Sequence, residues 1–212
     1  MEVLKKLIKD KNPEALSIIA GGGVDVNAEF EEKYRPSGRA LAVRKVTLLL
    51  KAVESTNYDA VEQLIKYGAN VNLVDGDGRN ALYYLDFGMD MDGSKLKIFK
   101  LLIKNGIDVN SIDKIGATPL MYACQGDYFK VIELLKVGAD IDIMSNDGFT
   151  ARQIAEINGD EGIVNLFINA KRFRKSRARG AKSKLPYHHL FPLYQNMKNV
   201  LKQLKKKSKQ RK

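Results

Sequence analysis

The residues of this 212-residue chain that could bind a metal or act in catalysis are few. Asp86, Asp90 and Asp92 lie on one glycine-containing stretch, and hard cations such as Ca²⁺ take several carboxylate oxygens from flexible loops. A calcium loop with Asp90 and Asp92 at its third and fifth positions would have Gly88 at the first and Phe99 at the twelfth, and neither supplies a side-chain ligand. We therefore predict no metal site there.

The other candidates for chemistry are Cys124, His188 and His189. Two adjacent imidazoles do not supply the three or four ligands that zinc needs. Cys124 stands at a small-residue position of a predicted helix, where burial is expected. The glycine run 21–23 follows a predicted helix, so it cannot aim helix N-terminal amides at a phosphate. No nucleophile is paired with a base, and we predict a protein that is not an enzyme and binds no cofactor.

Charge is distributed unevenly along the chain. The formal net charge is +11, yet residues 1–170 hold 20 of the 36 basic residues and all 25 acidic residues, a net charge of −5. Residues 171–212 hold the other 16 basic residues and no acid, which indicates two parts with different partners. The single cysteine favours a reducing compartment. Because the sequence shows neither a signal peptide nor a long apolar run, we expect a soluble, cytoplasmic protein.

The first 170 residues contain an internal repeat, which decides the fold class. In each copy an apolar residue is followed by an apolar pair three and four positions later, and a glycine comes next. This spacing forms one helix face, and the glycine ends the helix in a left-handed turn. The clearest copies are residues 61–72, 99–110 and 131–142, with weaker copies at 16–27 and 164–168 and turn glycines at 23, 68, 106 and 138.

The other half of the repeat places Thr or Asn before a short apolar stretch, as in residues 113–123 and 147–155. These residue types cap helix N-termini, and Pro119 suits the first helical position. The strings Gly-Ala-Asp-Ile-Asp at 138–142 and Gly-Ala-Thr-Pro-Leu at 116–120 resemble ankyrin repeats, and the resemblance covers residues 2–168. It implies an all-α helical repeat solenoid of about five units over residues 1–170, followed by a basic C-terminal extension.

The sequence departs from this family pattern in two ways. The histidine that usually follows Thr-Pro-Leu, and that bonds neighbouring units, is replaced by Leu50, Tyr83, Met121 and Gln153, so we expect that bond to be absent. Insertions are expected near 28–45 and 86–97. The first is either a tolerated loop or a partner-binding finger.

The resemblance also implies a protein-binding module whose hairpin tips and inner helices form a concave recognition surface. Tyr83 and Phe149 are the expected anchors, because aromatic residues tend to dominate interface energies. We expect a monomer that binds a protein partner. The positions that vary in the motif give the predicted contacts, which are Arg79, Tyr83, Lys114, Ile115, Gln125, Asn146, Asp147, Phe149 and Ile157.

The basic tail, residues 171–212, is a second candidate for binding. Its lysines and arginines can neutralise phosphates and release counterions. An apolar stripe predicts an amphipathic helix over 190–206. The alternatives are nucleic-acid or ribonucleoprotein binding, attachment to an anionic membrane, nuclear import in a eukaryotic cell, and folding back as a cap on the solenoid. The predicted polyanion-binding residues are Lys171, Arg172, Arg174, Lys175, Arg177, Arg179, Lys182 and Lys184.

Overall fold

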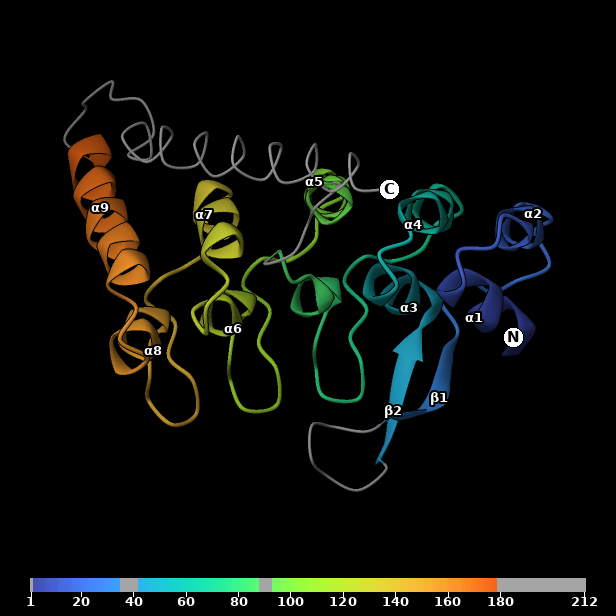
Figure 1. Cartoon of the computed structure of the whole chain (residues 1–212), viewed down its shortest axis with the longest axis horizontal. Coiled ribbons are helices and arrows are strands. Elements are labelled where there is room, and N and C mark those ends of the chain that lie inside the picture. The colour runs from blue at the N-terminus through green and yellow to red at the C-terminus, as the bar shows by residue number, and fades with distance from the viewer. Residues whose placement is uncertain (1, 35–41, 88–92, 179–212) are drawn as a thin grey trace, which may run out of the picture.

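The protein is a row of helix pairs with loops projecting from one side (Figure 1). The computed structural model describes residues 2–34, 42–87 and 93–178, and it describes side chains up to residue 170. This is the helical repeat arrangement that the sequence predicts. The pairs are α1 (Glu2–Lys9) with α2 (Glu14–Ala20), α3 (Leu48–Glu54) with α4 (Tyr58–Lys66), the 3₁₀ helix η1 (Ala81–Tyr84) with α5 (Ser94–Lys104), α6 (Pro119–Ala123) with α7 (Tyr128–Lys136), and α8 (Ala151–Ile157) with α9 (Glu161–Ala178).

The helices form two rows. The inner row consists of α1, α3, η1, α6 and α8, and the outer row of α2, α4, α5, α7 and α9 lies above it in Figure 1. Most neighbouring helices touch along each row, since α3 contacts α1 and η1 while α4 contacts α2 and α5. The predicted apolar stripes fill the space between the rows, where Leu64, Leu102 and Leu134 are fully buried. Each unit buries its apolar face only against its neighbours, so stability depends on stacking.

The predicted capping residues begin the inner helices. Thr47, Thr118 and Thr150 precede α3, α6 and α8, and each side chain accepts a hydrogen bond from the backbone N–H three residues later. Such a bond satisfies one of the amides that a helix start leaves without a partner. In the third unit Asn80 accepts from the N–H of Leu82, but η1 ends after one turn because Leu85 is extended.

Glycines end the outer helices, also as predicted. Gly68, Gly106 and Gly138 have φ values of 87°, 79° and 91°, in the left-handed region that favours glycine. After α2 the left-handed residue is Gly22, with φ of 74°, and the prediction of Gly23 at this place was wrong by one position.

The insertion expected over 28–45 is a β-hairpin, which corrects the prediction of an all-α chain. Strand β1 (Glu29–Tyr34) pairs antiparallel with β2 (Ala42–Thr47). Along β1, partly buried residues alternate with exposed ones, so Phe30, Glu32 and Tyr34 share one face. This period of two is the signal of a half-buried strand. The hairpin lies beside the shorter loops of the other units in Figure 1.

Two boundaries differ from those predicted. Residues 94–97, assigned to the second insertion, form the first turn of α5, where the N–H of Lys97 donates to the carbonyl of Gly93. Helix α9 continues to Ala178, so the predicted end of the solenoid at residue 170 falls inside a helix. The side chains from Lys171 to Lys184 and the predicted helix over 190–206 lie outside the part that is described. Within that part, every helix is too short or too polar to cross a bilayer.

Candidate protein-binding surface

An aspartate shapes the loop that leads into each of two inner helices. Asp75 Oδ1 accepts hydrogen bonds from the N–H groups of Asp77 and Arg79, at 2.8 and 2.9 Å. Asp113 Oδ1 does the same for Ile115 and Ala117, at 3.0 and 2.9 Å. Both aspartates are buried, so the two loops start from the same fixed turn.

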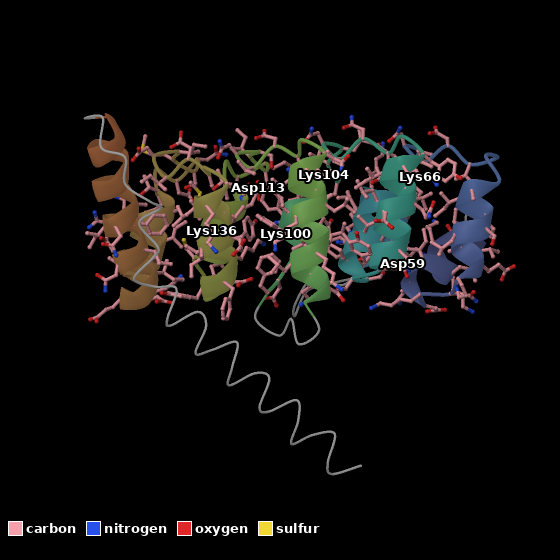
Figure 2. The ribbon with its side chains drawn as sticks, turned by 90° about the horizontal axis from the view of Figure 1, so that it is seen from above. Asp59, Lys66, Lys100, Lys104, Asp113 and Lys136 are labelled. Atoms are coloured by element: carbon pink, nitrogen blue, oxygen red, sulfur yellow. The ribbon has the colours of Figure 1, made fainter. Side chains whose placement is uncertain are left out.

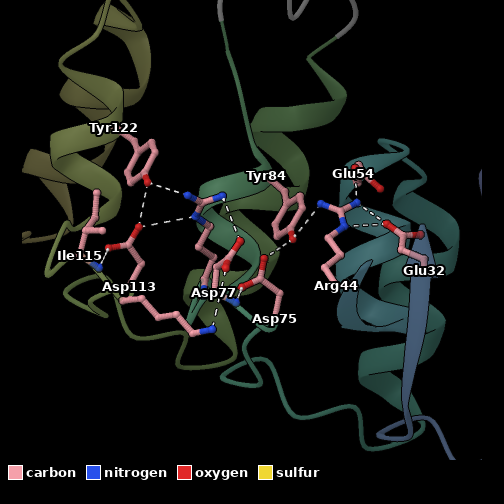
Figure 3. A network of polar contacts seen from close by, with 11 residues as sticks. Glu32, Arg44, Glu54, Asp75, Asp77, Tyr84, Asp113, Ile115 and Tyr122 are labelled. Atoms are coloured by element: carbon pink, nitrogen blue, oxygen red, sulfur yellow. Dashed lines mark hydrogen bonds and ion pairs between the residues drawn. The ribbon is translucent and has the colours of Figure 1, made fainter. Parts of the chain in front are cut away.

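The second carboxylate oxygen of each aspartate binds a tyrosine on the following inner helix (Figure 3). The hydroxyl of Tyr84 donates to Asp75 Oδ2 at 2.6 Å, and it accepts from Arg44 Nη1 at 3.2 Å. In the next unit the hydroxyl of Tyr122 donates to Asp113 Oδ2 at 2.8 Å and accepts from Nη2 of Arg79 at 2.8 Å. Each arginine comes from the preceding unit. A tyrosine–aspartate pair and an arginine thus join neighbouring units twice along the inner row.

Arg44 also ties the β-hairpin to the inner row. On the strand side it pairs with Glu32, with its Nε 2.7 Å from Glu32 Oε1, and on the α3 side Nη2 lies 2.7 Å from Glu54 Oε1. Lys51 completes the cluster at 2.8 Å from carboxylate oxygens of both glutamates. Burial opposes charge on Arg44, but its hydrogen bonds to Glu54 and Glu32 outweigh burial and raise the pKa of its guanidinium. The hairpin is therefore fixed to α3 by four charged groups.

We call the contact between an aspartate, the tyrosine nine residues later and an arginine of the preceding unit a polar joint. The last loop has no polar joint. Ser145 and Ile154 occupy the positions equivalent to Asp113 and Tyr122. Ser145 Oγ accepts only a longer bond of 3.3 Å, from the N–H of Phe149. The hydrogen-bonded contacts that join the units near the β-hairpin therefore do not continue into the last loop.

Most of the predicted contacts are exposed on this surface. Ile115 is 55% exposed, Phe149 is 41% exposed and Ile157 is 68% exposed, all large exposures for apolar side chains. The polar members Lys114, Gln125, Asn146 and Asp147 are exposed as well. The backbone N–H of Asn146 donates to the carbonyl of Ile115 at 2.9 Å, which places the last two loops side by side.

Tyr83 and Arg79 have structural contacts that the sequence did not reveal. The hydroxyl of Tyr83 lies 2.6 Å from the carbonyl of Ser111 and 2.7 Å from that of Ala117, and its single proton can serve one of them at a time. Tyr83 thus bonds neighbouring units from the position of the missing family histidine, and the expectation that no such bond exists was wrong here. Because both Tyr83 and Arg79 are half-buried in joints, Phe149 is the stronger candidate anchor.

Three further exposed apolar residues of the loops were missed. Ile112 and Met144 are 58% and 64% exposed and stand directly before Asp113 and Ser145, at the same place in consecutive loops. Val74 holds the equivalent place before Asp75 and is 39% exposed. The sequence could have revealed them, because an apolar residue recurs at the same position of consecutive loops that are otherwise polar.

The outer row has a different surface (Figure 2). Lys100 and Lys104 on α5 are exposed, as is Lys66 on α4. Lys136 on α7 is paired with Glu133 at 2.7 Å. Large exposed apolar side chains on this row are few among the described residues, with Tyr67 at 40% the largest. The apolar groups suited to docking are therefore concentrated on the loops and inner row.

The thiol of Cys124 is fully buried at the end of α6, as predicted. Burial, together with the nearby charge of Asp160, raises the pKa of Cys124 to about 12. The thiol is therefore protonated at neutral pH and is a poor nucleophile. The other candidates for metal chemistry, Asp90, Asp92, His188 and His189, lie outside the described residues.

Comparison with known proteins agrees with this architecture. Residues 90–178 match a model of three ankyrin repeats, and residues 44–73 match a single ankyrin repeat. An ankyrin repeat protein of Acanthamoeba polyphaga mimivirus is 26% identical over 164 residues, which are 73% of this chain and 20% of that protein.

Two relatives carry the names of enzymes. The human 2-5A-dependent ribonuclease is 35% identical over 99 residues, 47% of this chain and 13% of the relative. A palmitoyltransferase of Saccharomyces cerevisiae is 35% identical over 72 residues, 34% of this chain and 9% of the relative. The chain thus spans a small part of these longer proteins. Ankyrin repeats are typically non-catalytic and generally mediate protein–protein interaction. The two matched segments, the paired helices and the projecting loops together place the chain in the ankyrin repeat family.

Proposed function

We propose that the chain binds a protein partner through its loops and inner helices, with the main apolar contact on the last two loops. The observation that carries this proposal is the set of apolar side chains exposed on these two loops and at the end of α8. Apolar groups gathered on the surface of a folded protein mark interaction sites more often than isolated ones do. The set consists of Ile112, Ile115, Met144, Phe149 and Ile157.

The same surface suggests the character of the partner. An apolar anchor on the partner would pack between Ile115 and Phe149, which lie on loops joined by the bond from Asn146 to Ile115. Toward the β-hairpin the surface becomes polar, with the Arg79 and Arg44 guanidinium groups already bonded within the protein. These two guanidinium groups would help to orient the bound partner but would add little to its affinity, because charges that are exposed or already paired add little binding energy.

The experiment is to capture partners of the full chain from its native lysate and to measure their affinity for two matched variants. Phe149→Ala removes an aromatic side chain that is 41% exposed on the last loop, and Tyr67→Ala removes one that is 40% exposed on the outer row. We expect Phe149→Ala to weaken binding about tenfold or more, the effect of a central aromatic anchor. Tyr67→Ala should leave the affinity unchanged. Equal affinities for the two variants would refute the proposed surface.

A further inference from the structure

Three loops that project side by side in Figure 1 have the same backbone structure. The N–H groups of Asp75, Asp113 and Ser145 each donate to the carbonyl four residues later, at 2.9, 3.0 and 3.0 Å. In each loop a left-handed glycine, with φ of 82°, 71° and 78°, donates its N–H to the carbonyl of that first residue. The residue directly before each loop therefore has the same place in all three units, and it is Val74, Ile112 or Met144.

We call these three residues the apolar row, because each exposes an apolar side chain. Val74 is 39% exposed, Ile112 is 58% exposed and Met144 is 64% exposed. The exposed Ile115 and Phe149 stand at other places, where the matching residues of the other loops are polar or small. The apolar row is therefore the part of the loops that offers the same kind of contact once in every unit.

The spacing of the apolar row follows from the bonds between loops. The N–H of Lys114 donates to the carbonyl of Asp77 at 2.9 Å. The carbonyl of Ile115, the next residue, accepts from the N–H of Asn146 at the same distance. One unit therefore adds one hydrogen bond and two residues of chain, and two extended residues span at most about 7 Å. The loops pack directly against each other here, since a Cβ on Gly116 would lie 2.8 Å from the backbone nitrogen of Asn146. The row thus repeats at about 10 Å or slightly less, in keeping with helices that pack about 8–10 Å apart.

A peptide in the polyproline II conformation matches this spacing. It makes one turn in three residues and rises about 3.1 Å per residue, so every third side chain points the same way at intervals of about 9 Å. In a β-strand alternate side chains share a face, at intervals of about 7 Å. An α-helix makes about two turns in 10 Å and would place every second turn between two contacts. Of the three conformations, polyproline II alone presents one side chain per turn and one turn per unit.

The charges beside the apolar row have both signs. Lys114 stands two residues after Ile112, Asp142 stands two residues before Met144, and both charged residues are exposed. They favour neither an acidic nor a basic partner. The spacing of the apolar contacts, and not their charge, defines what the row can recognise.

We propose that the protein partner contributes an extended segment in the polyproline II conformation with an apolar side chain at every third residue. Three successive apolar side chains of this segment pack beside Val74, Ile112 and Met144. Such a segment is largely formed before it binds and loses little conformational entropy on docking. The inference rests on the proposed protein-binding function, names the class of partner, and continues the proposed surface from the last two loops to the loop that begins after Val74.

The probe is a capped peptide of three leucine-proline-glutamine triplets, titrated into the full chain labelled with ¹⁵N. We expect the amide signals of Val74, Ile112 and Met144 to shift together. A peptide of the same composition with its leucines at alternate positions should bind at least fivefold more weakly.

The variants Val74→Thr, Ile112→Thr and Met144→Gln replace apolar side chains by polar ones of similar size. Each should weaken binding of the triplet peptide about threefold to tenfold, through the loss of one partly buried apolar contact. The losses should multiply when two variants are combined, because the sites lie about 10 Å apart. Val3→Thr is the matched control, since Val3 is 69% exposed on α1, and it should leave the affinity unchanged. Thermal unfolding of each variant checks that the stack is intact.

Three results would overturn this inference. Equal affinities for the two peptides, or no binding of either, would show that the three-residue period is not recognised. Tighter binding of a helical peptide with leucine at every seventh residue would assign the row to a helix. An affinity that Val74→Thr leaves unchanged, while Ile112→Thr and Met144→Gln lower it, would confine the contact to the last two loops. None of these results affects the comparison of Phe149→Ala with Tyr67→Ala, so the broader function can stand or fall separately.

Discussion

The hydroxyl of Tyr122 donates a hydrogen bond of 2.8 Å to the carboxylate of Asp113, nine residues earlier in the chain. Tyr84 makes the same bond to Asp75, also nine residues earlier, at 2.6 Å. Each pair ties an inner helix to the loop that leads into it, and an arginine of the preceding unit completes the contact. The stability of the stack therefore depends on polar joints as well as on its apolar core.

Tyr84→Phe tests one joint. The change removes a hydroxyl and leaves a buried oxygen of Asp75 and one N–H of Arg44 without that partner. Because unsatisfied buried polar groups cost about 1–3 kcal/mol, the free energy of unfolding should fall by about 1–2 kcal/mol in urea titrations. Tyr58→Phe is the matched control, since the Tyr58 hydroxyl bonds Glu62 in an exposed pair and its loss should matter by less than about 0.5 kcal/mol. Similar losses in the two variants would contradict a structural role of the joint.

Glu54→Gln tests the charge cluster that holds the β-hairpin. Burial of Glu54 opposes its charge, but hydrogen bonds from Lys51 and Arg44 prevail and lower its pKa from the ordinary 4.5. A lowered folded-state pKa gives stability that is present above pH 4.5 and lost as the pH falls through the folded value. The stability difference between the original protein and Glu54→Gln should therefore be largest at pH 7 and shrink toward pH 3. A difference that is the same at both pH values would show that the carboxylate charge is not involved.

Thr56→Gly should stabilise the protein. Thr56 has φ of 52°, in the left-handed region that is unfavourable for a β-branched side chain. Glycine relieves this strain but increases the conformational entropy of the unfolded chain. We expect the free energy of unfolding, measured in urea, to rise by about 0.5–1 kcal/mol. Ser55→Gly, one residue earlier with φ of −78°, is the control and should destabilise, because it relieves no strain and loses the bond from Ser55 Oγ to Lys51.

Lys130→Met tests the effect of a buried charge on α7. Burial lowers the pKa of Lys130 from 10.5 to about 8, against the attraction of Asp127 and Asp86. Between these values the unfolded chain holds a proton that the folded protein has released, so stability of the original protein should rise with pH over this window. Lys130→Met removes this titration.

The measurement for Lys130→Met is urea unfolding at pH 7 and at pH 10. We expect the stability of the variant relative to the original protein to fall by about 1–3 kcal/mol between the two pH values. Lys104→Met, at an exposed position of α5, controls for the loss of one lysine. A relative stability that does not change with pH would show that Lys130 keeps its proton throughout.

The repeat architecture was predictable because each helix carries its own signals. The apolar stripe around Leu64, the cap at Thr118 and the glycine at position 68 are local in sequence, and the structure places all three as expected. The β-hairpin was missed because its inward face contains charged residues, Glu32 and Arg44, which are partly buried in contacts with each other and with Lys51 and Glu54. A search for alternating apolar residues does not detect a strand with such a face.

The bonds that link one unit to the next could not be predicted, because they join residues 28 to 43 positions apart in the sequence. The family pattern identified Tyr83 as a replacement for histidine, but only the structure shows that the phenol reaches the carbonyls of Ser111 and Ala117. The exposure of Ile112 and Met144, in contrast, could have been inferred from their matching places in two polar loops.

The loops are linked to one another by a bond that recurs along the chain. The N–H of Gly76 bonds Lys45, that of Lys114 bonds Asp77 and that of Asn146 bonds Ile115, each at 2.9 Å. A backbone bond makes no demand on side-chain identity, so the coupling between two units survives when their sequences diverge. If a whole unit were duplicated or lost in the gene, the two loops brought together would still have the backbone donor and acceptor that form this bond. The length of such an array can therefore change in evolution by one unit at a time, while the recognition residues on each loop are selected independently.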